Sequence, residues 1–224
     1  MQPIAQGRAA EVFDAGPGRV LRRYRDRAQD TAGEAQIMRH AARAGYPVPA
    51  VYDADGPDLV LERIDGPTML ETLGSRPWLL RSYARVLADL HTRLGKIPAP
   101  AGLRHPLGAG NDLLHLDLHP GNVLLSPRGP VVIDWTNASA GPAAADVADT
   151  WLILACARPD EGDRLVAAVQ RLYARMFLTR AGRASAAGHL HDAFAHRVGD
   201  HNMTPSELRR MRELVRRETG REPV

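Results

Sequence analysis

Cysteine and lysine are almost missing from this chain of 224 residues. Cys156 is the only cysteine, so no disulfide can form within the chain, which fits a reducing compartment. Lys96 is the only lysine, so nearly all of the 29 basic residues are arginines. The formal net charge is only +3 and the arginines are spread along the chain, apart from the C-terminal stretch. This composition indicates a bias in genomic base composition, and it does not favour nucleic acid as a partner.

Long apolar runs are missing too. The first twenty residues hold no apolar run long enough for a signal peptide, and no stretch approaches the roughly 18–20 apolar residues that cross a bilayer. Internal repeats and low-complexity linkers are also absent from the sequence. We therefore expect a soluble, cytoplasmic protein with no membrane partner. A chain of this length with 44% hydrophobic residues can bury a sizeable core in one or two domains.

Strand-like patterns fill the first sixty-odd residues. Residues 10–13 and 19–24 flank the turn signal Ala-Gly-Pro-Gly and predict a hairpin. Residues 31–34, Thr-Ala-Gly-Glu, have the pattern of a capping box and predict the start of a helix. Two more strands are expected at residues 50–53 and 59–62. This part of the chain therefore reads as a small sheet with one main helix.

Helical patterns dominate the rest of the chain. A helix is expected after Pro77, with apolar residues at helical spacing: Leu80, Tyr83, Leu87, Leu90 and Leu94. Short strands are expected at three places: residues 113–116, 123–125 and 131–133. A second capping box at residues 204–207 predicts a last helix that ends near Gly220. We predict an α+β chain with a small β-rich lobe (1–64), a hinge at about 62–66, and a larger, mainly helical lobe (65–224).

The most informative segment is His115-Leu-Asp117-Leu-His119-Pro-Gly-Asn122, followed twelve residues later by Asp134 in Val-Val-Ile-Asp-Trp. A buried strand would deliver Asp117 into a tight turn, and a hairpin would return the chain to a strand that ends at Asp134. Mg²⁺ takes hard oxygen ligands such as Asp and Asn. Phosphoryl transfer also needs a carboxylate that orients the attacking hydroxyl and accepts its proton. The spacing therefore predicts a phosphoryl-transfer site.

This pattern, H-x-D-x-x-x-x-N with a downstream I-D-W, resembles that of the aminoglycoside phosphotransferase and choline kinase-like small-molecule kinases, which have a two-lobed protein-kinase-like fold. Further segments between about residues 6 and 155 resemble parts of that family in the same order: QGRAAEVF its phosphate loop, RVLRRY its third strand, LVLERIDG its hinge, LADLHTRL the helix before the catalytic loop, and GPAAADVADT the segment behind the site.

The resemblance implies a role for each matching residue. Asp117 would be the catalytic base, with Asn122 and Asp134 as ligands of Mg²⁺ and with ATP or GTP as phosphate donor. Nucleotide-binding roles would fall to Gly7 of the phosphate loop, Arg22 of the third strand, the helix carboxylate Glu34, and the hinge backbone at Glu62 and Ile64. The resemblance also implies that Asp146 braces the catalytic loop together with His115.

The chain departs from the family at two positions. The family usually presents a lysine from its third strand to the nucleotide phosphates, whereas this chain has Arg22 at the matching position. Arginine keeps the positive charge and can bind phosphate bidentately, so we expect Arg22 to contact the phosphates, with a surface arginine on an edge strand as the alternative. The phosphate loop also has a single glycine, Gly7, which makes its backbone less permissive.

Several residues allow a second interpretation. Asn122 could serve only the His-Pro-Gly-Asn turn, and Glu34 only the predicted capping box. On a strand, His115, Asp117 and His119 would share one face, which could bind a transition metal. His119 could also lie near the substrate or simply be exposed, and His91 is expected to pack within its helix.

Only eleven residues separate Asp134 from Asp146, which leaves little room for a peptide platform. We therefore expect a small hydroxylated acceptor, such as an aminoglycoside-like antibiotic, a sugar, an amino alcohol or a nucleoside. Carboxylates that could bind a cationic acceptor are Asp149, Asp160, Glu161 and Asp163, although residues 160–163 also fit a solvated loop. The alternatives are a non-catalytic nucleotide-binding scaffold and, less favoured, a metal-dependent hydrolase. The sequence predicts no particular oligomeric state.

Overall fold

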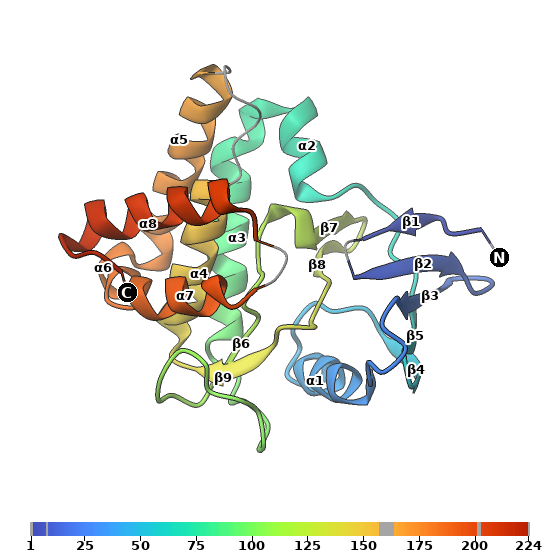
Figure 1. Ribbon diagram of the computed structural model, residues 1–224. Helices are drawn as coiled ribbons and strands as arrows, with labels where there is room; N and C mark the ends of the chain where they lie inside the picture. The colour runs from blue at the N-terminus through green and yellow to red at the C-terminus, as the bar shows by residue number, and fades with distance from the viewer. Residues whose placement is uncertain (1, 8, 157–163, 201–202, 224) are drawn as a thin grey trace. The chain divides into compact units, whose positions relative to one another are not determined.

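The computed structural model describes residues 2–7, 9–156, 164–200 and 203–223. The chain divides into two compact units, the first formed by Met1–Thr68 and Val123–Thr136 and the second by Met69–Asn122 and Asn137–Val224. The first unit contains an antiparallel sheet with one main helix, and the second is mainly helical, so the predicted α+β class is confirmed (Figure 1). The hairpin within residues 123–136 belongs to the first unit, although it follows the catalytic loop in sequence.

A five-stranded antiparallel sheet forms most of the first unit, with the strand order β1-β2-β3-β5-β4. Its strands are β1 (Ala5–Gln6), β2 (Ala10–Asp14), β3 (Arg19–Tyr24), β4 (Val51–Asp55) and β5 (Asp58–Glu62). The predicted hairpin is confirmed, because β2 pairs with β3 in a register that sets Val12 opposite Arg22. The turn between them uses left-handed backbone at Gly16 and Gly18, which glycine adopts without steric strain.

Helix α1 (Ala32–Arg43) buries Glu34, Ala35, Ile37, Met38 and Ala41. The capping box predicted at residues 31–34 is wrong. The Thr31 hydroxyl donates to the Asp58 carbonyl at 3.0 Å, and the carboxylate of Glu34 accepts hydrogen bonds from Arg22 and Tyr24. A buried carboxylate gains more from a guanidinium than from a backbone amide, so tertiary contacts override the local pattern.

A second hairpin, β7 (Val123–Ser126) and β8 (Gly129–Val132), completes the first unit. It is joined to residues 66–68 by a bridge between Thr68 and Leu124 and by the Leu125 amide, which donates to the Pro67 carbonyl at 2.9 Å. A Cβ atom on Gly66 would lie 2.1 Å from the Leu125 carbonyl oxygen, so this close approach requires glycine.

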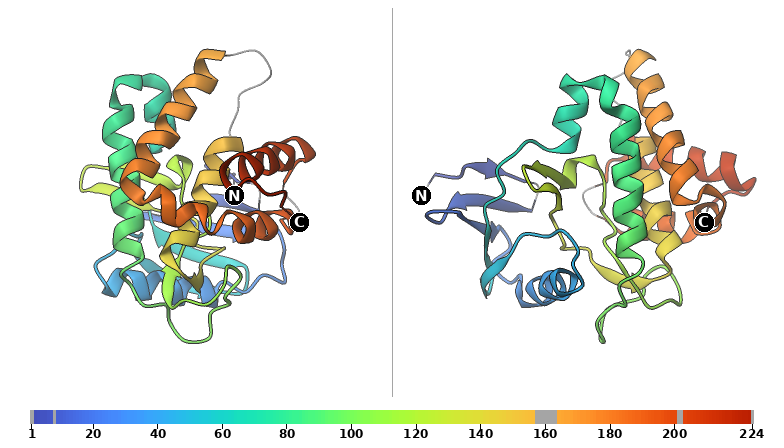
Figure 2. Two further views of the ribbon diagram at one scale, coloured as in Figure 1. Left: turned by 90° about the vertical axis from the view of Figure 1, so that its left-hand side faces the viewer. Right: turned by 180° about the vertical axis from the view of Figure 1, so that it is seen from behind.

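The second unit has seven α-helices among its described residues: α2 (Met69–Ser75), α3 (Leu80–Leu94), α4 (Ala143–Cys156), α5 (Arg164–Ala181), α6 (Arg183–Ala187), α7 (Leu190–Val198) and α8 (Pro205–Thr219). A 3₁₀ turn, Pro77–Leu79, precedes α3. Helix α4 packs against α3, α5, α7 and α8, and it is buried along most of its length (Figures 1 and 2). The predicted cap of the last helix is confirmed, with a capping box between Thr204 and Glu207 and a left-handed Gly220 at the end.

Two short strands of the second unit, β6 (Asp112–Leu114) and β9 (Ser139–Gly141), pair antiparallel. The strand predicted at residues 113–116 is therefore too long at its C-terminal end. It ends at Leu114 because Leu116 has a positive φ of 55°, which turns the chain out of the ladder. Within the described part of the chain, no helix is both long enough and apolar enough to cross a bilayer.

Candidate active site

The predicted catalytic loop, residues 115–122, follows β6 in the second unit and ends in a 3₁₀ turn, Pro120–Asn122. Asp146 on α4 anchors its start, since one carboxylate oxygen accepts from the amides of His115 at 3.1 Å and Leu116 at 2.7 Å. Asp146 is buried, and burial alone raises its pKa, but His91 and the Leu116 amide together lower the pKa below its ordinary value. Asp146 therefore holds the loop as a carboxylate.

His91 on α3 is the side chain that meets the second oxygen of Asp146. Its Nδ1 lies 3.1 Å from Asp146 Oδ2, and its Nε2 lies 3.1 Å from the hydroxyl of Thr150. Thr150 in turn donates to the Leu118 carbonyl at 2.8 Å. The sequence predicted that His91 packs in its helix, and the family resemblance implied that His115 assists Asp146. In the structure, His115 contributes its backbone amide, and the imidazole of His91 faces the carboxylate.

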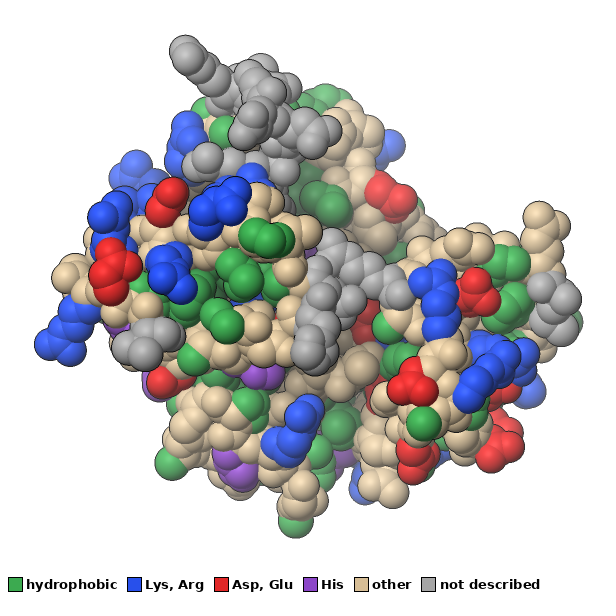
Figure 3. All heavy atoms as spheres, in the orientation of Figure 1, with side chains coloured by type: hydrophobic (Ala, Val, Ile, Leu, Met, Phe, Trp, Pro, Cys, Tyr) green, Lys and Arg blue, Asp and Glu red, His purple; other side chains and the backbone are tan. Residues whose placement is uncertain are grey.

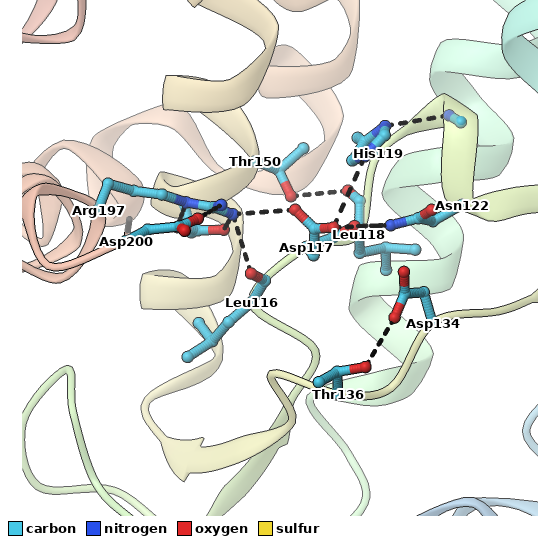
Figure 4. Close-up of polar contacts among 12 residues, drawn as sticks. Leu116, Asp117, Leu118, His119, Asn122, Asp134, Thr136, Thr150, Arg197 and Asp200 are labelled. Carbon is cyan, nitrogen blue, oxygen red and sulfur yellow. Dashed lines mark hydrogen bonds and ion pairs between the residues drawn. The ribbon is translucent and has the colours of Figure 1, made fainter. Parts of the chain in front are cut away.

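Asp117 projects from the middle of the loop and both of its carboxylate oxygens have partners (Figure 4). Asn122 Nδ2 donates to the Asp117 carbonyl and to Oδ2, both at 2.9 Å. Arg197 Nη2 donates to Oδ1 at 3.2 Å. The Asp117 side chain is 25% exposed. The carboxylate is thus oriented from two sides and still accessible to solvent.

Arg197, on α7, is the residue of this site that sequence reasoning missed. Its side chain is 7% exposed and forms a fork with Asp149 on α4, with Nε–Oδ1 at 2.7 Å and Nη2–Oδ2 at 2.6 Å. Burial raises the pKa of Asp149 to about 6, although Arg197 lowers it. Burial lowers the pKa of Arg197, but the charges of Asp149 and Asp117 outweigh this and raise it. The only signal in the sequence was Asp149 itself, one helical turn after Asp146.

The imidazole of His119 lies beside Asp117. Its Nδ1 accepts from the Gly121 amide at 3.1 Å, and its Nε2 lies 3.8 Å from Asp117 Oδ2. The shared strand face imagined for His115, Asp117 and His119 does not form, because these residues follow the end of β6 and do not extend it. Across the described ranges, no group of three or more His, Cys, Asp or Glu side chains could hold a metal ion.

In the first unit, Asp134 follows β8 and pairs with Arg22 of β3. Arg22 Nη2 lies 2.6 Å from Asp134 Oδ1, and Arg22 Nη1 lies 2.6 Å from Glu34 Oε1. Burial lowers the pKa of Arg22, but Asp134 and Glu34 together raise it well above its ordinary value. The Arg22 side chain is 12% exposed, whereas that of Asp134 is 43% exposed.

Glu34 is the carboxylate at the centre of this cluster. Its Oε2 accepts from the Tyr24 hydroxyl at 2.6 Å, and its Oε1 accepts from the Trp135 amide at 3.2 Å as well as from Arg22. Of the non-glycine residues that the structure describes, only Leu116 and Asp134 have positive φ, at 55° and 66°. Such backbone strain is characteristic of functional sites, and here it occurs in the two segments that carry the predicted chemistry.

The remaining predicted residues lie in the first unit. The Gly7 amide donates to the Ala10 carbonyl at 2.8 Å in the turn between β1 and β2. Glu62 ends β5; its amide donates to the Ala50 carbonyl at 2.8 Å, and its carboxylate pairs with Arg128 at 2.6 Å. Ile64 follows and is half-buried.

The suggestion that Asp149 binds a cationic acceptor is wrong, because Asp149 is fully buried and paired with Arg197. The other three acidic candidates, Asp160, Glu161 and Asp163, lie outside the described residues. The structure therefore brings together Asp117, Asn122 and Arg197 in the second unit, and Arg22, Glu34 and Asp134 in the first.

Comparison with known proteins gives the class to which this fold and site belong. A family described as "Phosphotransferase enzyme family" matches residues 1–112 and 106–189. The chain belongs to this family, and the predicted resemblance is confirmed.

This chain is also similar to individual relatives over part of their length. It is 32% identical over 149 residues to EKC/KEOPS complex subunit BUD32 of Chaetomium globosum, and 28% identical over 148 residues to a probable bifunctional tRNA threonylcarbamoyladenosine biosynthesis protein of Methanoculleus marisnigri. These alignments cover 60% and 61% of this chain. They span 53% of the first relative and 24% of the second, so the chain matches about half and about a quarter of these proteins.

Solved structures show the same fold at low sequence identity. A thermostable mutant of aminoglycoside phosphotransferase APH(4)-Ia, in a ternary complex with AMP-PNP and hygromycin B, matches with a TM-score of 0.70 and 16% identity over 98% of this chain and 94% of that one. Choline kinase LicA from Streptococcus pneumoniae matches with a TM-score of 0.59 and 13% identity over 97% and 92% of the two chains. These neighbours confirm the kinase-like fold.

Proposed function

We propose that this protein is a Mg²⁺-dependent kinase that transfers the γ-phosphate of ATP or GTP to a hydroxyl of a small molecule. The observation that carries the proposal is the carboxylate of Asp117, which Asn122 and Arg197 hold from opposite oxygens while a quarter of the side chain stays exposed. A carboxylate fixed in this way can meet a substrate hydroxyl in one defined orientation.

Asp117 orients the attacking hydroxyl and accepts its proton as the phosphoryl group moves. General-base assistance of this kind contributes about 10²–10⁴-fold to a rate. His119 Nδ1 is occupied by the Gly121 amide, so in the neutral ring Nε2 carries the proton and points a donor toward the side of Asp117. His119 therefore supports the position of the carboxylate or of a bound hydroxyl.

The donor atoms of Asn122 and Asp134 suit Mg²⁺. Asn122 uses its Nδ2 to donate to Asp117, which leaves the amide oxygen to accept, and the Asp134 side chain is 43% exposed. Amide and carboxylate oxygens are hard ligands of the kind that Mg²⁺ requires. When bound, Mg²⁺ would neutralise charge on the nucleotide phosphates. Asn122 and Asp134 are the residues that would hold it.

The nucleotide would contact the first unit. Because the Glu62 amide already donates to Ala50, Glu62 would offer its carbonyl to a purine, and Ile64 would offer its backbone amide. Arg22 would contact the phosphates after exchanging its bond to Asp134 for a phosphate oxygen, and the Gly7 turn would lie over them. The acceptor class stays open among aminoglycoside-like antibiotics, sugars, amino alcohols and nucleosides.

One observation favours a second candidate, a nucleotide-binding scaffold without catalysis. The side chain of Arg22 engages Asp134 Oδ1 at 2.6 Å, and its positive charge would compete with Mg²⁺ for this carboxylate. If Arg22 kept Asp134, the protein would bind Mg²⁺ and nucleotide weakly and would not turn the nucleotide over.

A thermal-shift screen with Mg²⁺ and a non-hydrolysable nucleotide, followed by phosphate-transfer assays on the compounds that raise Tm, tests the two candidates. The kinase should show a rise in Tm with nucleotide, a further rise with its acceptor, and transfer that Asp117→Asn abolishes. Nucleotide binding without transfer to any hydroxyl compound of the four classes would favour the scaffold.

A further inference from the structure

Arg197 is far from the catalytic loop in sequence, yet its guanidinium touches the loop at two points (Figure 4). Nη2 donates to the Leu116 carbonyl at 2.9 Å and to Asp117 Oδ1 at 3.2 Å. The side chain is almost fully buried, so the guanidinium itself has little access to a substrate. An effect of Arg197 on the reaction must therefore pass through the residues that it touches.

Two residues of helix α4 restrain Leu116, one through its backbone amide and the other, by way of Arg197, through its backbone carbonyl. Asp146 accepts from the Leu116 amide at 2.7 Å, and Asp149, one turn later, holds the arginine that donates to the Leu116 carbonyl. Leu116 needs such restraint because its φ of 55° is unfavourable for a residue with a β-carbon. Strained backbone persists only where its surroundings over-determine it.

We propose that Arg197 is a positioning residue for the phosphoryl-transfer reaction. It keeps Leu116 in its left-handed conformation and holds Oδ1 of Asp117, so that Oδ2 stays against Asn122 and the carboxylate faces the hydroxyl to be phosphorylated. Arginine only donates hydrogen bonds and stays protonated, so Arg197 moves no proton in this role. This inference rests on the proposed function, because it assigns a task to Asp117.

Arg197→Met and Arg197→Lys test this role, with Arg180→Met as the matched control. Arg180 forms an exposed ion pair with Asp89 at 2.7 Å, and neither residue belongs to the candidate site. Arg197→Met should lower kcat about 10²-fold, as expected for a misplaced catalytic group, while KM for the nucleotide stays unchanged. Arg197→Lys should recover part of kcat, and Arg180→Met should match the wild type.

A crystal structure of Arg197→Met provides a readout that does not need turnover. We expect Asp117 to leave the position in which Asn122 Nδ2 lies 2.9 Å from Oδ2, and Leu116 to relax toward negative φ. An unchanged Asp117 in that structure, or unchanged kcat in a folded variant, would overturn the positioning role and leave the proposed function intact. A wild-type protein that binds nucleotide but transfers no phosphate would overturn the function, and the crystal structure would still decide the geometry.

A separate observation concerns a pocket of about 260 Å³ among α4, α5 and α8, away from the catalytic loop. Trp151, Leu178 and Leu214 provide apolar walls, and five arginines line it beside two glutamates. In the space-filling view, basic side chains gather over these C-terminal helices, at the left (Figure 3). We call this feature the arginine pocket, after its five arginines: Arg171, Arg175, Arg183, Arg210 and Arg217.

Three of these arginines lack a carboxylate partner among the described residues. Glu218 already pairs with both Arg183 and Arg217, whereas Arg171, Arg175 and Arg210 have no such ion pair in that part of the chain. The Nε atom of Arg210 is buried and, within the described residues, has no hydrogen-bond acceptor. A buried donor without an acceptor is unfavourable, and a bound anion would supply one.

The arginine pocket is distinct from the candidate active site. On α4, Asp146, Asp149 and Thr150 face the catalytic loop, whereas Trp151 and Leu154 line the pocket. At about 100° of rotation per residue, Trp151 lies at least about 100° around the helix from each of the three residues that face the loop. The volume is just below the roughly 300–1,000 Å³ typical of ligand pockets, which suits a small molecule.

The geometry points to a binding site for a small phosphorylated molecule, whose phosphate would meet the guanidinium groups. Titration calorimetry with inorganic pyrophosphate, without Mg²⁺, tests this site. Arg175→Gln and Arg210→Gln should each weaken binding about tenfold, since each removes a charge-assisted hydrogen bond. Arg209→Gln, an exposed neighbour on the same helix, should not change it. Equal binding by Arg175→Gln, Arg210→Gln and the wild type would overturn the assignment.

Discussion

Each of the two units places one arginine between two carboxylates: Arg22 between Glu34 and Asp134 in the first, and Arg197 between Asp149 and Asp117 in the second. In both clusters, one carboxylate is buried and the other is the residue to which chemistry is assigned. The clusters differ in sequence context, since Arg22 lies in a recognisable strand and Arg197 in a helix without any motif. They also differ in solvent access.

Solvent access decides what each arginine can do. Asp134 is 43% exposed, so Arg22 can exchange its bond to this carboxylate for a bond to a phosphate. Arg197 is bound through two nitrogens to a carboxylate with no exposure at all, and breaking such a pair leaves an uncompensated buried charge. The first arginine can therefore act as a ligand, whereas the second is suited to be a fixed support.

The largest expected effect comes from Asp117, the working carboxylate of the second cluster. Asp117→Asn should lower kcat by about 10²–10⁴-fold, because the amide cannot accept the proton of the attacking hydroxyl. Nucleotide affinity, measured by calorimetry, should stay close to that of the wild type. Asp89→Asn, at an exposed ion pair on α3, serves as the control. If Asp117→Asn turns over at the wild-type rate, Asp117 does not act as the base, and its role does not differ from that of the supporting carboxylate Asp149.

The two buried carboxylates provide the next test. Asp149→Ala should destabilise the protein by about 3–5 kcal/mol, because Arg197 would stay buried without its main partner. Glu34→Ala should cost less, since Arg22 keeps Asp134 and Thr136 as partners. Chemical unfolding of both variants at pH 7 measures the difference. Equal losses of stability in the two variants would mean that the two clusters do not differ in how much each depends on its buried carboxylate.

Arg22 itself should show the exchange of partners that its setting allows. Arg22→Ala should raise KM for the nucleotide by about 10–100-fold, in line with the 1.5–3 kcal/mol of a charged hydrogen bond. Arg22→Lys should recover part of this, since it keeps the charge but loses the fork of donors. If KM and kcat are unchanged in Arg22→Ala, Arg22 serves structure alone and the first cluster would resemble the second.

Much of the fold could be predicted from the sequence because its signals are local. The hairpin of β2 and β3 follows from a turn between apolar runs, and the cap at Thr204 from side chains three residues apart. The prediction failed where a residue distant in sequence competes for a side chain. Thr31 and Glu34 have the spacing of a capping box, but their side chains form hydrogen bonds with Asp58 and Arg22 instead.

The candidate site divides in the same way. Asp117 and Asn122 are five residues apart in a motif, so sequence alone could single them out. The contacts of Arg197 with Asp149 and Asp117 join residues 48 and 80 positions apart, and no local pattern encodes such contacts. The contact of His91 with Asp146 is likewise a product of packing between α3 and α4. Supporting residues are therefore harder to predict than the residues they support.

The smallest expected effect concerns the pH dependence of Asp149. Its pKa is about 6 in the folded protein and ordinarily 3.8, so the folded state holds this proton more tightly than the unfolded state. The contribution of Asp149 to stability is therefore fully present below pH 4 and is lost as the pH rises to about 6, with a slope of at most about 1.4 kcal/mol per pH unit. Asn cannot bind the proton, so the free energy of unfolding of the wild type relative to Asp149→Asn should fall between pH 4 and 6 and stay level above pH 6.

Chemical unfolding in steps of half a pH unit measures this difference. Asp146 does not interfere, because its lowered pKa places its own loss of stability at more acidic pH. A flat difference across this window would mean that Arg197 keeps Asp149 ionised throughout, and the second cluster would then be a permanent ion pair whose support of Asp117 does not depend on pH.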